Sequence, residues 1–230
     1  MEYLLKLQDF VDHVEDYEKN CRKYAENAFW RAHEELGGNF LAHPLAESVI
    51  KPIIHKFLGL WRSYRHHIDW KKLAETWTAD VQNIAASLTD VRLEFADDLA
   101  LAKADNLYLH LLSSNIEGMG HTNISKVLAL SLTNLCVMWD SGAKREFMRN
   151  HPPAPRIRQT HGDYYRFLRH RRQVATDLIT QVVEKQRINT FEAVDWLRKI
   201  PLRIGYGREK PLAKLLDEYY YGRSRTGNAN

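Results

Sequence analysis

Apolar residues recur at helical spacing from the start of the chain. Between Tyr3 and Ala28 they lie alternately four and three positions apart, with acidic and basic residues between them. This spacing places an apolar stripe on one face of a helix. We predict a long first helix that Gly37-Gly38 ends, because glycine commonly follows the last turn of a helix. The stripe is interpreted as packing within the chain, and alternatively as the contact of a homodimer through residues 3–28.

The rest of the chain also has a helical pattern. No glycine or proline occurs in 60–117 or in 163–200, and no alternating strand pattern of useful length is present. We therefore predict an all-α protein. A single helix over 60–112 would be unusually long, so breaks are expected near 76–80, 87–90 and Asp105.

Other helices follow from local signals. Two short helices are expected around Pro44 and Pro52, and a basic helix over 163–185. Asn189 and Glu192 have the spacing of a capping box, which predicts a helix that ends before Pro201. A short amphipathic helix is expected over 210–220, and residues 151–155 form a linker or exposed turn.

The composition narrows the class of protein. Hydrophobic residues make up 44% and charged residues 27%, which is ordinary for a globular chain, and no apolar run is long enough for a membrane span. The N-terminus lacks the apolar core of a signal peptide, so we expect a cytoplasmic protein, nucleoid-associated if it binds DNA. Two cysteines exclude a disulfide framework and a four-cysteine zinc or iron–sulfur site. We expect no metal and no cofactor.

Charge is distributed unevenly along the sequence. Residues 1–140 contain 14 basic and 20 acidic residues, whereas residues 141–230 contain 19 and 9. The net charge is thus −6 in the first part and +10 in the second. A basic part of this kind is typical of a protein that binds a polyanion such as nucleic acid, and a solvated basic face is the alternative.

The most informative segment spans residues 116–145. Gly118-Met119-Gly120 predicts a tight turn between two helices, because glycine adopts positive φ without penalty. An apolar helix follows. The backbone N–H groups and the dipole at the start of that helix suit a phosphate group.

This segment resembles the helix-hairpin-helix DNA glycosylase superfamily. Residues 116–120 lie where that family has its L-P-G-V-G hairpin, and residues 138–145 lie over its aspartate segment, with Asp140 on the catalytic aspartate. The interval of 22 residues from Gly118 to Asp140 is similar to the family's spacing. The resemblance implies that the hairpin region binds DNA. The implied contacts are Gly118, Met119, Gly120, His121, Thr122, Asn123, Lys126, Lys144 and Arg145.

The resemblance also implies a reaction. A carboxylate at Asp140 would stabilise the positive charge that develops on the sugar when an N-glycosidic bond breaks, and would orient a water molecule. Trp139 is a candidate for the base pocket. Thr122 lies where bifunctional members carry a Schiff-base lysine, so the chain is expected to be monofunctional. Lys126 is expected to be a surface or phosphate-contacting lysine, and the alternative is an amine that compensates for the missing lysine at position 122. The alternative interpretation of Asp140 is a helix N-cap.

We therefore expect a two-lobed helical fold with a helix-hairpin-helix motif. Residues 36–149 would form one lobe, and residues 1–35 with 150–230 the other. The implied function is that of a DNA-repair hydrolase, a glycosylase acting on a damaged or mismatched base in double-stranded DNA. Two alternatives stay open: a DNA-binding hairpin protein without catalysis, and a helical module that dimerises through residues 3–28.

Overall fold

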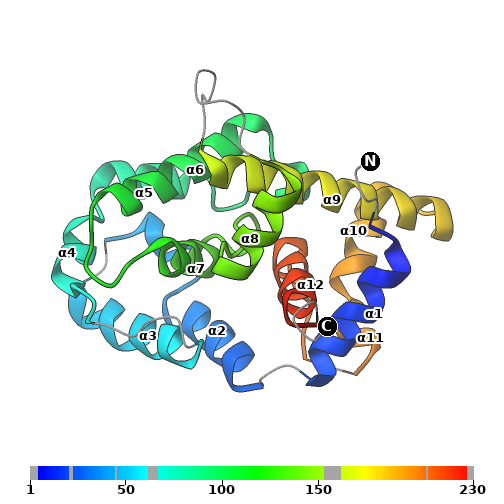
Figure 1. Cartoon of the computed structure of the whole chain (residues 1–230), viewed down its shortest axis with the longest axis horizontal. Coiled ribbons are helices and arrows are strands. Elements are labelled where there is room, and N and C mark those ends of the chain that lie inside the picture. Colours follow the sequence, from blue (N-terminus) through cyan, green and yellow to red (C-terminus); the bar gives the residue numbers. More distant parts are fainter. Residues whose placement is uncertain are drawn as a thin grey trace.

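The structure is a computed structural model that describes residues 5–20, 23–44, 46–61, 67–152, 162–205 and 207–226. Figure 1 shows that the elements in this part of the chain are helices. They are α1 (Leu7–Asn20), α2 (Lys23–Glu35), η1 (Phe40–Ala42), α3 (Glu47–Leu60), α4 (Trp70–Glu75), α5 (Ala79–Ala86), η2 (Leu93–Phe95), α6 (Asp98–Ser113), α7 (His121–Ser131), α8 (Ser141–Asn150), α9 (Asp163–Gln186), α10 (Thr190–Arg198), α11 (Ile200–Arg203) and α12 (Leu212–Thr226).

The all-α prediction is confirmed, since the described residues contain no strand. Among those residues, no helix combines the length and the apolar character that crossing a membrane requires. The basic helix is α9, and the capping box of α10 is present as expected. The linker expected at 151–155 falls partly on residues outside the described part of the chain.

The prediction of a single long first helix is wrong, because the N-terminal stripe divides between two helices with different neighbours. α1 packs on α12, whereas α2 packs on α3. The α1 part of the stripe, including Phe10 and Val14, is buried within the chain, and the Phe10 ring lies 5.6 Å from that of Tyr219. The stripe therefore serves, over α1, as packing within the chain. The glycine pair after α2 adopts φ of +75° and +73°, as the predicted helix end requires.

The helices over 60–113 end and begin at capping residues, and a polar residue by itself does not end a helix. The breaks predicted near 76–80 and 87–90 are confirmed, and Thr78 caps α5 by accepting a hydrogen bond from the Val81 amide. The break predicted at Asp105 is wrong, because α6 runs through this residue. The Asp105 carboxylate is buried and accepts hydrogen bonds from the amides of Gly162 and Tyr165, at the start of α9.

Two further predictions need correction. A single helix, α3, occupies the region around Pro52, and this proline is exposed within it. The helix expected to be amphipathic over 210–220 is instead buried on nearly all sides from Leu212 to Tyr219. Its Lys214 is only 3% exposed and is paired with buried carboxylates, so charge in the sequence does not here mark a solvent-facing side.

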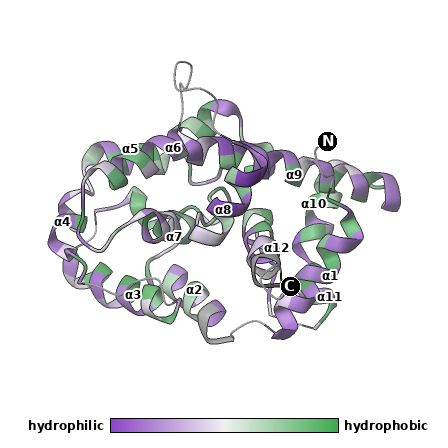
Figure 2. Cartoon of the chain, viewed as in Figure 1, coloured by the Kyte–Doolittle hydropathy of each residue, from purple (hydrophilic) through white to green (hydrophobic). Residues whose placement is uncertain are grey.

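Two central helices organise the core. α7 lies within a group formed by α2, α3 and α6, and α12 lies between α8, α9 and α1 (Figure 1). All residues from Asn123 to Ser131 of α7 are buried. Figure 2 shows hydrophilic residues interspersed with hydrophobic ones on most of the surrounding helices. The buried apolar side chains form one continuous cluster, which holds both central helices in place.

Candidate functional site

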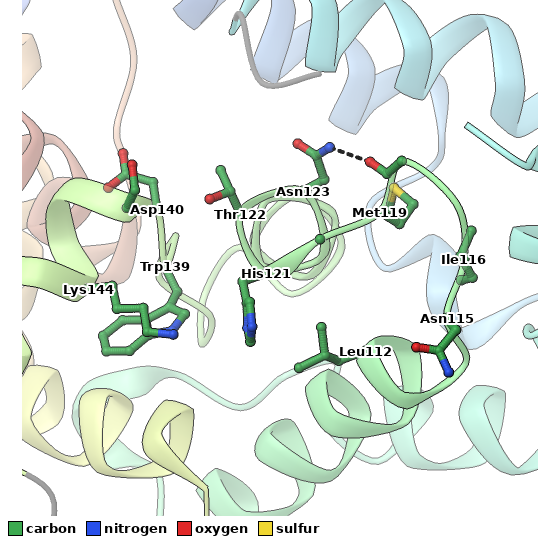
Figure 3. A pocket seen from close by; sticks show the side chains of 13 residues that line it. Leu112, Asn115, Ile116, Met119, His121, Thr122, Asn123, Trp139, Asp140 and Lys144 are labelled. Carbon is green, nitrogen blue, oxygen red and sulfur yellow. Dashed lines mark hydrogen bonds between the residues drawn. The ribbon is translucent and has the colours of Figure 1, made fainter. Parts of the chain in front are cut away.

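The predicted hairpin and Asp140 line one pocket of about 710 Å³. Its wall begins at the end of α6, continues through the turn at 118–120 and the start of α7, and ends at the start of α8. Figure 3 shows His121 between Leu112 on one side and Trp139 with Lys144 on the other. The pocket residues are Leu112, Asn115, Ile116, Gly118, Met119, Gly120, His121, Thr122, Asn123, Trp139, Asp140, Ser141 and Lys144.

The hairpin turn depends on Gly118. This residue adopts a φ of +74°, and a Cβ atom there would lie 2.3 Å from the His67 carbonyl oxygen and 2.9 Å from Cγ1 of Ile68. The Asp69 amide also donates a hydrogen bond of 3.2 Å to the Glu117 carbonyl oxygen. One side of the turn is therefore packed against residues 67–69, while the other side lines the pocket.

The N-terminus of α7 opens on this pocket without a side-chain cap. Its N-cap residue is Gly120, which provides no capping side chain. The Asn123 side-chain amide donates a hydrogen bond of 2.8 Å to the Gly118 carbonyl oxygen, drawn in Figure 3, and so ties the helix to the turn. The first amides of a helix have no partner within the helix, and His121 and Thr122, the first residues of α7, line the pocket. This arrangement suits an anionic group.

Asp140 is both a helix N-cap and a residue of the pocket wall. It is the N-cap of α8, and its Oδ1 accepts a hydrogen bond of 2.8 Å from the Ala143 amide. It is also half-buried and lines the pocket. Capping therefore occupies one carboxylate oxygen and does not remove the side chain from the pocket.

His121 is held by a residue that sequence analysis missed. The Tyr108 hydroxyl and His121 Nδ1 are 2.6 Å apart. Burial, and the charge of Asp105, raise the pKa of Tyr108 well above its usual value, so its hydroxyl stays protonated. Burial and the nearby Lys144 lower the pKa of His121. The lowered pKa favours the neutral form of the ring at pH 7. Tyr108 lies 13 positions before His121, on another helix, and no local pattern connects the two.

Three of the residues predicted for the site do not have the exposed position in the pocket that was expected of them. Lys126 is 5% exposed, and its Nζ lies 5.1 Å from the centre of the Trp61 ring, so the expected surface position is wrong. Trp139 lines the pocket but is 1% exposed, because its ring packs against Phe167. Arg145 is exposed on α8 and does not line the pocket.

The side chain of Met119 is also buried, at the tip of the turn. It contributes packing to the hairpin, and the neighbouring backbone provides the polar groups. Within the described residues, no group of three or more potential metal ligands occurs.

Comparison with known proteins does not assign this site to a family. No protein-family model, no curated protein and no solved structure matches the chain.

Proposed function

We propose that the chain is a monofunctional DNA glycosylase-like protein. The observation that supports this function best is that the 118–123 turn, Lys144 and Asp140 border one pocket of about 710 Å³. A DNA glycosylase needs two things: a group that binds the DNA backbone, and a carboxylate near the sugar of the target nucleotide. These residues all lie within the segment 116–145, and the resemblance in sequence implies the same set.

In this proposal the turn and α7 form a helix-hairpin-helix motif with α6. The amides at the start of α7 bind a DNA phosphate, and Lys144 of the same pocket adds a positive charge. The two lobes of the fold are residues 36–149 and residues 1–35 with 150–230. Basic residues of 141–230 supply sequence-independent affinity for double-stranded DNA, which therefore falls steeply as salt rises.

The chemical step is assigned to Asp140. Its carboxylate stabilises the positive charge on the sugar as the base leaves, and it orients the attacking water. Base extrusion from the helix costs a few kcal/mol, which DNA contacts must offset. Position 122 is a threonine, and Lys126 is a buried residue of α7 that does not line the pocket, which supports hydrolysis without strand cleavage.

The test uses the capping geometry of Asp140. Asparagine caps a helix about as well as aspartate, so Asp140→Asn keeps the bond to the Ala143 amide and removes the charge. Asp97 is a matched control, because it caps α6 in the same way through the Ala100 amide and does not line the pocket. Both variants are assayed on double-stranded oligonucleotides that carry a panel of damaged or mismatched bases, with alkaline cleavage revealing abasic sites.

We expect base release by the wild-type chain and by Asp97→Asn, and a loss of at least about 100-fold in Asp140→Asn. Equal rates in Asp140→Asn and the wild-type chain would contradict the assignment of Asp140. Salt-sensitive DNA binding without release from any substrate would identify the non-catalytic alternative. Absence of DNA binding at low salt would exclude both.

A further inference from the structure

A second, much smaller cavity lies next to Asp140. Its volume is about 10 Å³, close to the space that one water molecule needs. Apolar residues such as Met138 and Phe167 form part of its wall, and Asp140 and Asp217 are its acidic residues. Asp140 lines this cavity and the large pocket, so it stands between them.

Asp217 is a buried carboxyl group that the proposed function has not used. It lies on α12 and is 8% exposed. Its Oδ2 is 3.5 Å from Nζ of Lys214, one turn earlier on the same helix. The other charged groups that face it are Lys126 on α7, Asp140 before α8 and Arg171 on α9.

Burial raises the pKa of Asp217 to about 6, and the charge of Asp140 acts in the same direction. Lys214 and Lys126 oppose this shift. A carboxylate whose pKa lies near the working pH is an efficient proton acceptor. The small cavity thus brings such a group next to the carboxylate assigned to the chemical step.

We infer that Asp217 is a positioning residue that accepts, across the small cavity, the proton that water gives to Asp140. This inference rests on the proposed function and extends it. It gives the buried end of α12 a role in the hydrolysis, whereas the resemblance in sequence ended at residue 145.

The proton balance of this reaction needs only water. The C1′–N bond of the nucleotide breaks, and its electron pair goes to the leaving base, which takes a proton from solvent. The oxygen of water bonds to C1′, and one proton of that water passes through Asp140 to Asp217. Asp217 then releases the proton to solvent, and both carboxyl groups regain their starting state.

The closing experiment combines a rate measurement with one that needs no activity. Single-turnover base release is followed from pH 5 to 8 for the wild-type chain, Asp217→Asn and Glu218→Gln. Glu218 is the matched control, because it is buried next to Asp217 and paired with Lys214, but it does not line the small cavity. Separately, carbon-13 NMR follows the carboxyl titration of Asp217 in the wild-type chain and in Asp140→Asn.

We expect wild-type release to rise with pH through about 6, and Asp217→Asn to lose this inflection with a rate about 100-fold lower. Glu218→Gln should keep the inflection. In NMR, Asp140→Asn should lower the titration midpoint of Asp217.

Three results would overturn the inference: an unchanged inflection in Asp217→Asn, its equal loss in Glu218→Gln, or an Asp217 midpoint that ignores Asp140→Asn. The NMR result is informative even if Asp217→Asn does not fold. An Asp217 titration midpoint that shifts in Asp140→Asn, without base release from any substrate, would refute the proposed function and with it the catalytic use of Asp217. It would still establish the electrostatic coupling between Asp140 and Asp217.

Discussion

The two glycines of the hairpin provide a matched test of the turn that borders the pocket. Gly118→Ala places a methyl group at a φ of +74°, which costs about 1–2 kcal/mol for a residue other than glycine. The same Cβ lies 2.3 Å from the His67 carbonyl oxygen, so residues 67–69 must move. That movement disrupts the hydrogen bond from the Asp69 amide to Glu117, worth about 1 kcal/mol.

The expected loss of unfolding free energy in Gly118→Ala is therefore about 2–3 kcal/mol. Gly120→Ala is the control. The φ angle at Gly120 is −81°, and a Cβ atom there would have no heavy atom within 4 Å other than those of its chain neighbours. This variant should cost at most about 1 kcal/mol, since alanine is a poorer N-cap than glycine.

Urea unfolding at pH 7 measures both variants against the wild-type chain. With a slope of roughly 2 kcal/mol/M, the midpoint of Gly118→Ala should fall by about 1–1.5 M. Equal midpoints for the two variants would show that the turn does not press against residues 67–69, and the description of the hairpin would be wrong.

Three further predictions concern buried charges. Lys210→Met should lower the unfolding free energy, measured in urea, by about 3–5 kcal/mol, because Lys210 is 2% exposed and binds carboxylates from α1, α2 and α12. Lys199 is exposed, so Lys199→Met should change the unfolding free energy by less than about 1 kcal/mol. Asp105→Ala should cost about 1–3 kcal/mol by leaving buried amides of α9 unpaired, and an unchanged urea midpoint would argue against this cap. Burial, and the charge of Glu26, raise the pKa of Glu218 to about 8. The folded state therefore binds a proton more tightly than the unfolded state, and the stability that Glu218 contributes falls as pH rises from about 4.5 to 8. The melting temperature of Glu218→Gln should lack this part of the fall with pH.

Local signals in the sequence identified much of the fold. The spacing of apolar residues predicted helices, and capping residues placed several of their ends, as Asn189 does for α10. Glycines predicted the end of α2 and the bend before α7, and the structure gives positive φ at Gly37 and Gly118. These features depend on the conformation of a few adjacent residues, and the sequence contains that information directly.

The site was predicted in part for a similar reason. Gly118 and Asp140 are connected by a single helix, so a fixed interval in sequence gives an approximate distance in space. The structure brings both to one pocket. Tyr108 and Asp217 could not be found in this way. Tyr108 lies on the helix before His121 and no local pattern connects the two residues, whereas Asp217 comes from α12, far along the chain from Asp140.

Burial of charge was decided by the tertiary structure alone. The sequence by itself determined that the chain is helical, where its glycine turns lie, and that its second part is basic. It could not show that Asp105 caps a distant helix, that Lys126 is buried, or that α12 carries paired charges through the core. A charged side chain is stable away from water only when groups of opposite charge or hydrogen-bonding groups surround it, and those groups come from several helices that only the folded chain brings together.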